Sequence, residues 1–169
     1  AAVLAVLGAG IWGAEHLTRL ADDHFYQDRI VLSSSSPYQR IVVTQGRQGA
    51  RLYLNGNLQF AQSDEYRYHE ALVHPAMAAH GAPKRVAVLG GGDGMAVREV
   101  LKYPGVEAVT LVELDPAMTG LFRSNAMMAA LNSQALSDAR VQVINTDAFQ
   151  WLQQTQEVFD VVIVDFPDP

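Results

Sequence analysis

The sequence predicts an α/β protein with a doubly wound parallel sheet, preceded by a small antiparallel β unit. From residue 84 onward, short apolar runs rich in β-branched residues alternate with helical patterns, which is typical of a parallel sheet covered by helices. A glycine-rich turn, GGGDG, follows the first of these runs. Farther upstream, an Asn-Gly pair between alternating apolar residues predicts a β-hairpin. With 169 residues, 49% of them hydrophobic, the chain can form one domain with a substantial core.

Residues 1–32 are expected to lead into the folded part of the chain. The first 14 residues are apolar and uncharged, which is short of the roughly 18 to 20 needed to cross a bilayer. Two interpretations stay open. The segment is either the end of a transmembrane region, with Trp12 near the membrane surface, or a buried or signal-like apolar stretch. Residues 14–32 are interpreted as an amphipathic connector.

The small β unit is expected to follow a turn-rich boundary, SSSSP, at residues 33–37. A strand is predicted at 40–44 from the run RIVVT. The run RLYLNGNLQF at 51–60 predicts a hairpin that turns at Asn55 and Gly56, because this dipeptide suits the positive φ angles of a tight turn.

A helix is predicted from Ser63 to His80. It opens with a capping residue and two acids, and Pro75 is expected to kink or end it. Together with the hairpin, this helix completes a unit spanning residues 33–80.

Residues 81–169 are expected to form the doubly wound domain. Four parallel strands are predicted, each but the last followed by a helix. The strands are expected at 85–89, 106–114, 140–145 and 159–165, and the helices at 95–103, from Pro116, and at 147–154. Because only four strands fall within the sequence, we expect the sheet to be incomplete at its C-terminal end.

Composition excludes several classes of function. The net charge is −6 and no Lys/Arg run occurs, so nucleic-acid binding has no electrostatic basis. The chain has no cysteine, which excludes disulfides, thiolate metal sites and cysteine nucleophiles. An acidic protein suits a cationic small molecule, although this is weak support.

Carboxylates stand at the carboxyl end of every predicted parallel strand, which is where such sheets bind ligands. These residues are Asp93, Glu113, Asp115, Asp147, Asp165 and Asp168. Their mutual repulsion is unfavourable unless hydrogen bonds, water or a cation offset it. The sequence therefore predicts a ligand rich in hydrogen-bond donors and positive charge.

Some of these acids have structural explanations. Asp115 precedes Pro116 and is expected to be the N-cap of the following helix. Asp147 can also cap the helix after it. Glu113 follows Gly90 by 23 residues, the place where nucleoside-binding α/β folds put an acid that accepts the ribose hydroxyls.

The glycine turn departs from a dinucleotide fingerprint. A fingerprint that starts at Gly90 needs glycine at its sixth position, where this chain has Met95. The carboxylate of Asp93 would also repel a pyrophosphate. A nucleoside without phosphate is favoured, such as a sulfonium compound of the S-adenosylmethionine type. Asp93 would repel the carboxylate of an ordinary methyl donor, so a decarboxylated donor ending in an ammonium group fits best.

With these residues in place, the sequence from about residue 37 to 169 resembles the polyamine aminopropyltransferases (spermidine synthases). The resemblance rests on an ordered set of motifs: PYQ, LYLNGNLQF, DEYRYHE with a following HP, VLGGGDGMAVREV, VELDP, DAFQWL and DVVIVDFPDP. It implies a Rossmann-like fold of the methyltransferase type. The apolar opening is similar to the branch of the family whose enzyme domain follows a membrane-spanning region.

The resemblance implies a role for each candidate residue. The nucleoside of decarboxylated S-adenosylmethionine would be bound by Gln39, Gln59, Glu113 and Asp147, with Glu113 on the ribose and Asp147 on the adenine amino group. Gly90 would be a further substrate-binding residue. Asp93 would bind the aminopropyl ammonium. Tyr68, His69 and Asp168 would hold the acceptor amine, and Asp165 would be the general base. The family varies at the position of His69.

The expected reaction transfers an aminopropyl group to a polyamine, with putrescine giving spermidine, and releases methylthioadenosine. No metal and no cofactor is expected, since the donor is a co-substrate. Two alternatives stay open: a small-amine N-methyltransferase that uses intact S-adenosylmethionine, and a membrane-tethered binding module without turnover. We also expect a homo-oligomer and a cytoplasmic catalytic domain, attached to the membrane if the opening segment is transmembrane. His74 and His80 lack partners at metal spacing and are interpreted as surface or capping residues.

Overall fold

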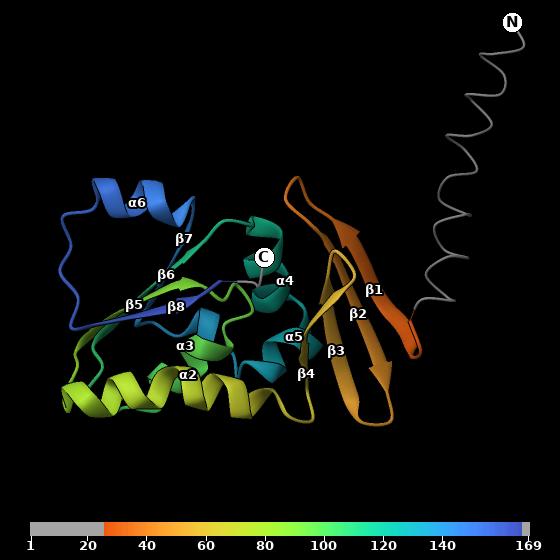
Figure 1. The fold of residues 1–169 in the computed structure, drawn as a ribbon, viewed down its shortest axis with the longest axis horizontal. Coiled ribbons are helices and arrows are strands. Elements are labelled where there is room, and N and C mark those ends of the chain that lie inside the picture. The colour runs from red at the N-terminus through yellow and green to blue at the C-terminus, as the bar shows by residue number, and fades with distance from the viewer. Residues whose placement is uncertain (1–25, 167–169) are drawn as a thin grey trace, which may run out of the picture.

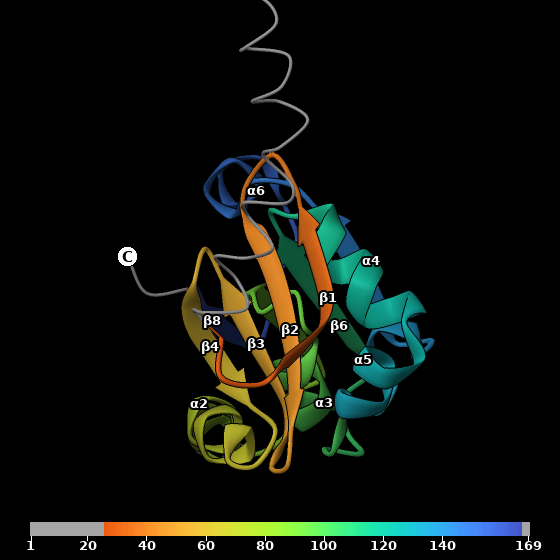
Figure 2. The same ribbon diagram turned by 90° about the vertical axis from the view of Figure 1, so that its right-hand side faces the viewer.

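A computed structural model describes residues 26–166. Within them the chain forms two four-stranded sheets that lie side by side, with helices packed around the second (Figures 1 and 2). The first sheet is antiparallel and the second is parallel. This confirms the predicted α/β architecture and the small antiparallel unit before it.

The antiparallel sheet has the order β1-β2-β3-β4. Its strands are β1 (Arg29–Ser35), β2 (Arg40–Gly46), β3 (Gly49–Leu54) and β4 (Asn57–Ala61). Asn55 and Gly56 connect β3 to β4 with φ angles of 51° and 85°, the pair of positive values that a type I′ turn requires. The predicted hairpin is therefore confirmed at its turn.

The structure corrects the prediction for residues 29–35. They were expected to end a connector and begin a flexible boundary, but they form β1 and pair with β2 along its length. Ile30 and Leu32 are half-buried and Leu32 packs against the core, whereas the serines that follow in the strand are exposed. Serine has little intrinsic preference for strands, and here the backbone bonds to β2 determine its conformation. The β unit thus begins at Arg29, inside the segment assigned to the lead-in.

Helix α2 (Glu65–His80) links the two sheets. Pro75 lies inside it and does not end it. Pro75 is on the exposed side, while Val73 and Met77 are fully buried in the core on the opposite side. Burial of this apolar face stabilises the helix enough to continue past the missing backbone hydrogen bond.

The parallel sheet has the order β7-β6-β5-β8. Its strands are β5 (Arg85–Gly90), β6 (Ala108–Glu113), β7 (Val141–Asn145) and β8 (Val161–Asp165), and all four were predicted to within a few residues. The helices of this part are α3 (Met95–Leu101), α4 (Pro116–Ser124), α5 (Ala126–Leu131) and α6 (Ala148–Gln154), with a 3-10 turn at Ala135–Ser137. Helices α2 and α3 lie on one side of the sheet and α6 on the other (Figure 1).

The strand order of the parallel sheet indicates where a ligand site is expected. Strand β5 pairs with β6 on one side and with β8 on the other. The chain segments on the two sides of β5 therefore diverge at its carboxyl end. In open α/β sheets such a switch point is where the connecting segments separate and leave a crevice for ligands. The antiparallel sheet lies on the side toward which β5 and β8 point (Figure 1).

Candidate functional site

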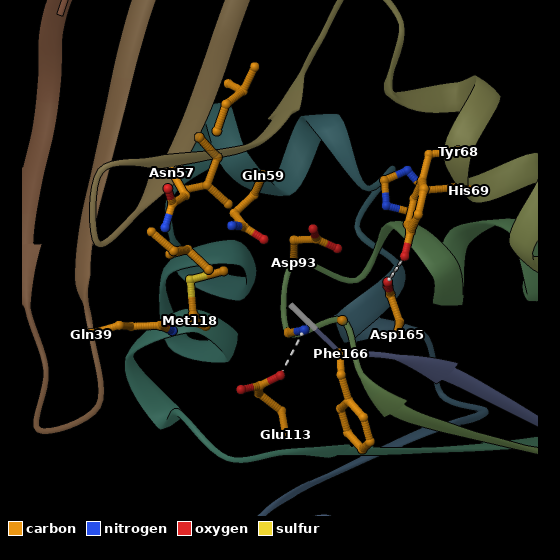
Figure 3. Close-up of a pocket in the computed structure, with 15 residues that line it drawn as sticks. Gln39, Asn57, Gln59, Tyr68, His69, Asp93, Glu113, Met118, Asp165 and Phe166 are labelled. Atoms are coloured by element: carbon orange, nitrogen blue, oxygen red, sulfur yellow. Dashed lines mark hydrogen bonds between the residues drawn. The ribbon is translucent and has the colours of Figure 1, made fainter. Parts of the chain in front are cut away.

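A cavity of about 420 Å³ opens at the carboxyl end of β5, between the two sheets. Figure 3 shows Gln39, Asn57 and Gln59 of the antiparallel unit on one side of Asp93, and Tyr68 and His69 of α2 on the other. The acids that line it are Asp93, Glu113 and Asp165. The structure thus brings together three of the six predicted acids in one cavity.

The turn between β5 and α3 places Asp93 at the centre of the cavity. Gly90 has a φ of +80° and lies against the backbone carbonyl of Asp165, so a side chain at Gly90 would collide with β8. Met95, at the position where a dinucleotide fingerprint has glycine, is fully buried in the core. The backbone N–H of Met95 donates to Oδ1 of Asp93 at 2.9 Å, which orients the carboxylate.

Burial raises the pKa of Asp93 to about 6. The neighbouring charges of Asp165 and Glu65 act in the same direction, whereas His69 and the N–H of Met95 oppose it. Asp93 is therefore an acid that a nearby cation would favour in its ionised form.

Asp165 ends β8 and accepts a hydrogen bond from the hydroxyl of Tyr68 at 2.8 Å on Oδ1 (Figure 3). Burial raises its pKa, and the bond from Tyr68 and the charge of His69 oppose that rise only in part. A carboxylate with a raised pKa is a better proton acceptor near neutral pH than an exposed one.

Both carboxylate oxygens of Glu113 accept backbone N–H groups. Oε2 accepts from Gly92 at 3.1 Å, and Oε1 accepts from Asp115 at 2.9 Å. A Cβ on Gly92 would lie 2.7 Å from the Glu113 side chain, so only glycine permits this contact. Burial raises the pKa of Glu113, although the two N–H bonds oppose the shift. Each oxygen keeps a lone pair that can accept a ligand hydroxyl.

Asp115 is the N-cap of α4, as predicted, and its Oδ1 accepts the N–H of Ala117 at 2.9 Å. It has a second role that the sequence did not reveal. Oδ2 accepts the hydroxyl of Ser36 at 2.7 Å and the side-chain amide of Gln39 at 2.9 Å. Asp115 does lie at the predicted edge and lines a second cavity beside the first, but its carboxylate is buried and both of its oxygens accept hydrogen bonds from the protein. Asp115 thus fixes Gln39 at the cavity.

Asp147 caps α6, which was one of the two explanations left open. Its Oδ1 accepts the N–H groups of Phe149 and Gln150, and Oδ2 makes no hydrogen bond within the described residues. Asp147 lines a second cavity of about 410 Å³. This cavity shares Gln39, Glu113 and Phe166 with the first, so the two adjoin at these residues, and we call them together the cleft.

The second cavity has an apolar side that the sequence prediction missed. Leu114, Phe149 and Phe166 are exposed and line it, with the rings of Phe149 and Phe166 5.9 Å apart. Exposed aromatic residues beside a polar cleft suit the flat face of a base. The run DAFQ contained Phe149, but its exposure depends on how α6 packs.

Asp168 lies outside the described residues, so its predicted role stays a prediction. The expected membrane attachment likewise concerns residues 1–25, which are not described. Across residues 26–166, none of the helices combines the length and the apolar character needed to cross a bilayer. The expected homo-oligomer stays a prediction.

The prediction that His74 has no acidic partner is wrong. Its Nε2 lies 3.2 Å from Oε2 of the fully buried Glu99, and Glu70 is close enough to complete a group of three metal-ligand types. The ammonium of Lys102 lies 2.5 Å from the same oxygen of Glu99. A cation is thus already in place, and the cluster is an ion-pair network between α2 and α3. His80 also has an acid nearby, with Asp160 at 4.0 Å.

Fold and cleft together define a Rossmann-like α/β protein with an acidic site at the carboxyl ends of its strands. A family model described as the spermine/spermidine synthase domain matches residues 65–169. The chain therefore belongs to the spermine/spermidine synthase family, as its motifs predicted.

Relatives named polyamine aminopropyltransferase are similar to this chain over nearly its whole length. A polyamine aminopropyltransferase of Leptospira interrogans is 53% identical over 99% of this chain, and polyamine aminopropyltransferase 2 of Ralstonia nicotianae is 56% identical over 98%. The chain spans about a third of the length of these relatives, 34% and 32% respectively.

Solved structures confirm the fold. A spermidine synthase in complex with the transition-state analogue AdoDATO is 33% identical, with a TM-score of 0.78 over 83% of this chain and 47% of that one. The spermidine synthase of Thermotoga maritima is 32% identical, with a TM-score of 0.75 over 80% of this chain and 47% of that one. The methyltransferase-type Rossmann-like prediction is thereby confirmed.

Proposed function

We propose that this chain carries the donor and acceptor sites of a polyamine aminopropyltransferase. In this proposal the full-length protein transfers an aminopropyl group from decarboxylated S-adenosylmethionine to putrescine, giving spermidine and methylthioadenosine. The observation that carries the proposal is the cleft with Asp93, Glu113 and Asp165 on its wall. Among the described residues, no Lys or Arg lines either cavity of this cleft.

The donor would lie along the cleft with its nucleoside against the β6 side. Glu113, held by two N–H groups, accepts the two ribose hydroxyls, and the free Oδ2 of Asp147 accepts the adenine amino group. The base lies against the apolar side at Phe149 and Phe166. Gln39 lies between the two cavities and can reach the nucleoside from the antiparallel sheet.

The charged tail of the donor would enter the first cavity. Asp93 binds the aminopropyl ammonium, and Gln59 offers a polar side chain on the facing wall. Because burial raises the pKa of Asp93, a bound ammonium stabilises its ionised form. Tyr68 and His69, with Asp168 beyond the described residues, hold the acceptor amine.

The proton then moves as follows. An alkylammonium has a pKa near 10, so the acceptor amine arrives protonated and cannot attack. Asp165 accepts one proton from it, while the hydroxyl of Tyr68 steadies the carboxylate. The freed lone pair attacks the methylene next to sulfur, a C–N bond forms, and the C–S bond breaks. Sulfur takes the electron pair, so methylthioadenosine leaves neutral and the new secondary amine carries the positive charge.

The leaving group needs no metal or cofactor in this scheme, because the sulfonium is already cationic. Catalysis depends on holding the amine and the methylene in line and on one proton transfer. Asp165 lies at the end of a strand in the sheet, which fixes its position relative to Asp93.

The test is to incubate the full-length protein with decarboxylated S-adenosylmethionine and a panel of amines, and to identify the products by mass spectrometry. Spermidine and methylthioadenosine in equal amounts are expected with putrescine. Methylated amines formed from intact S-adenosylmethionine would support the N-methyltransferase instead. Binding of the donor without methylthioadenosine release in any mixture would support a non-catalytic module.

A further inference from the structure

A buried chain of charged groups lies directly behind the acceptor side of the cavity. His69 is only 3% exposed, and Glu65 lies one turn earlier on the same helix, α2. Arg98 approaches Glu65 from α3. Glu65 and Arg98 do not line either cavity of the cleft, so the proposed reaction assigns them no role.

Arg98 is fixed on every side. Its two terminal nitrogens donate to the two carboxylate oxygens of Glu65, each at 2.9 Å, in a bidentate pair. One of them also donates to the carbonyl of Leu131 at 2.7 Å, and Nε donates to Glu99 at 3.0 Å. The carboxylate of Glu65 is therefore held in one orientation.

That orientation determines the tautomer of His69. Nδ1 lies 2.8 Å from the carbonyl oxygen of Glu65 and 2.8 Å from its Oε2. Both neighbours can only accept, so Nδ1 must carry a proton. In the neutral ring Nε2 is then the acceptor nitrogen, and the ring lines the cavity near Asp93 and Asp165 (Figure 3).

We propose that Glu65 and Arg98 are positioning residues that present His69 to the acceptor amine as a neutral ring with Nε2 free to accept an N–H. This proposal rests on the proposed function and adds to it. Nε2 helps orient the amine lone pair toward the donor methylene. An imidazolium there would instead repel the cationic substrates.

The balance of charge around the ring explains why both residues are needed. Burial lowers the pKa of His69, but the bond to Glu65 and the charges of Asp93 and Asp165 raise it above its usual value. Tyr68, the remaining titratable neighbour, contacts the ring edge-on. Burial raises the pKa of Glu65, and the bonds from His69 and Arg98 lower it overall. Arg98 thus shares the carboxylate charge of Glu65, so the pKa of His69 is raised less than it would be by an unpaired Glu65.

Two substitutions should therefore move the pKa of His69 in opposite directions. Arg98→Met leaves the whole charge of Glu65 to the ring, so the pKa is expected to rise by about half a unit or more. Glu65→Gln removes that charge, so the pKa is expected to fall by about one unit. Lys102→Met is the matched control, because it removes a cation at the C-cap of α3 that contacts Glu99 and not Glu65.

The pKa is measured by NMR titration of histidine ring resonances in the full-length protein, with the His69 signal assigned by its loss in His69→Asn. Shifts of opposite sign for Arg98→Met and Glu65→Gln, with Lys102→Met unchanged, support the proposal. Shifts of the same sign, or no shift, overturn it. Because no turnover is needed, this result stands even if the full-length protein proves not to transfer aminopropyl groups.

Kinetics give a second readout. For Arg98→Met the KM of the acceptor amine is expected to rise several-fold at pH 7 and to recover at higher pH, with kcat changed less than about twofold. In the His69→Asn background, Arg98→Met should no longer move the pH profile. A pH profile that still moves there would overturn the proposal. If Arg98→Met does not fold, Arg98→Lys keeps the charge, loses the bidentate pair and should give a smaller shift of the same sign.

Discussion

The acidity of Asp93 can be tested through protein stability. Burial raises its pKa from 3.8 to about 6, so the folded protein holds this proton more tightly than the unfolded chain does. The ionised side chain of Asp93 is therefore unfavourable in the folded protein. At 1.36 kcal/mol per pKa unit, the cost approaches roughly 3 kcal/mol above pH 6. Asp93→Asn removes the charge and keeps an oxygen that can accept the N–H of Met95.

The effect of Asp93→Asn on stability should depend on pH in one direction. Below about pH 4, Asp93 of the parent is protonated in both the folded and the unfolded state, so the substitution does not change the free energy of unfolding through this charge. Between pH 4 and 6 the unfolded chain releases its proton first, and the parent loses stability. At pH 8 the variant is expected to have a free energy of unfolding higher by up to about 3 kcal/mol. Denaturant titrations of the ligand-free protein at pH 4 and pH 8 measure this difference.

The same substitution should weaken the binding of a ligand that carries an ammonium group. Binding of decarboxylated S-adenosylmethionine is expected to fall about 10- to 100-fold, the usual effect of losing a hydrogen bond to a charged group. Methylthioadenosine lacks the aminopropyl arm, so its affinity should stay within about twofold. Calorimetric titration compares the two. Equal losses for both ligands, or a variant less stable than the parent at pH 8, would refute the reasoning about Asp93.

The remaining predictions concern the other acids and one glycine. Asp165→Asn is expected to lower kcat by at least about 100-fold with donor affinity within a few-fold, and normal turnover would mean that another group is the base. Asp115→Ala removes the cap of α4 and the support of the 36–39 loop, so we expect a loss of about 1–2 kcal/mol in unfolding free energy and several-fold weaker methylthioadenosine binding. Unchanged affinity would show that this loop does not contact the nucleoside. Gly92→Ala should displace Glu113 and weaken the binding of methylthioadenosine about tenfold. Gly105→Ala is the control, because a Cβ there meets nothing within 4 Å and binding should not change. Equal effects of the two substitutions would contradict the clash at Gly92.

The parts of the fold that follow from local pattern were predictable. Alternation of apolar strands with helices gave all four parallel strands, and Asn55-Gly56 gave the hairpin turn. The convergence of Asp93, Glu113 and Asp165 also followed, because the carboxyl ends of parallel strands meet at one edge of a sheet.

The parts that depend on distant contacts were not predictable. Asp115 looked like a simple N-cap, and nothing local showed that Ser36, 79 residues away, donates to its other oxygen. Glu70, four residues before His74 on α2, could have been found by spacing, whereas Glu99 could not, because it lies on another helix. The strand at 29–35 is specified by its pairing with β2, which the sequence of four serines does not suggest.

The acids of the cleft are oriented by groups that do not neutralise them. Backbone N–H groups hold Asp93, Glu113 and Asp147, and each bond fixes a carboxylate while leaving its charge in place. A lysine or arginine would have oriented them equally well and cancelled the charge. The structure instead keeps Arg98 one layer behind the cavity, on Glu65. In the proposed function the positive charge comes from the ligand, and a phosphate would add charge of the wrong sign. Since burial raises the pKa of Asp93 and Glu113, a cationic ligand bound beside them would stabilise their ionised forms.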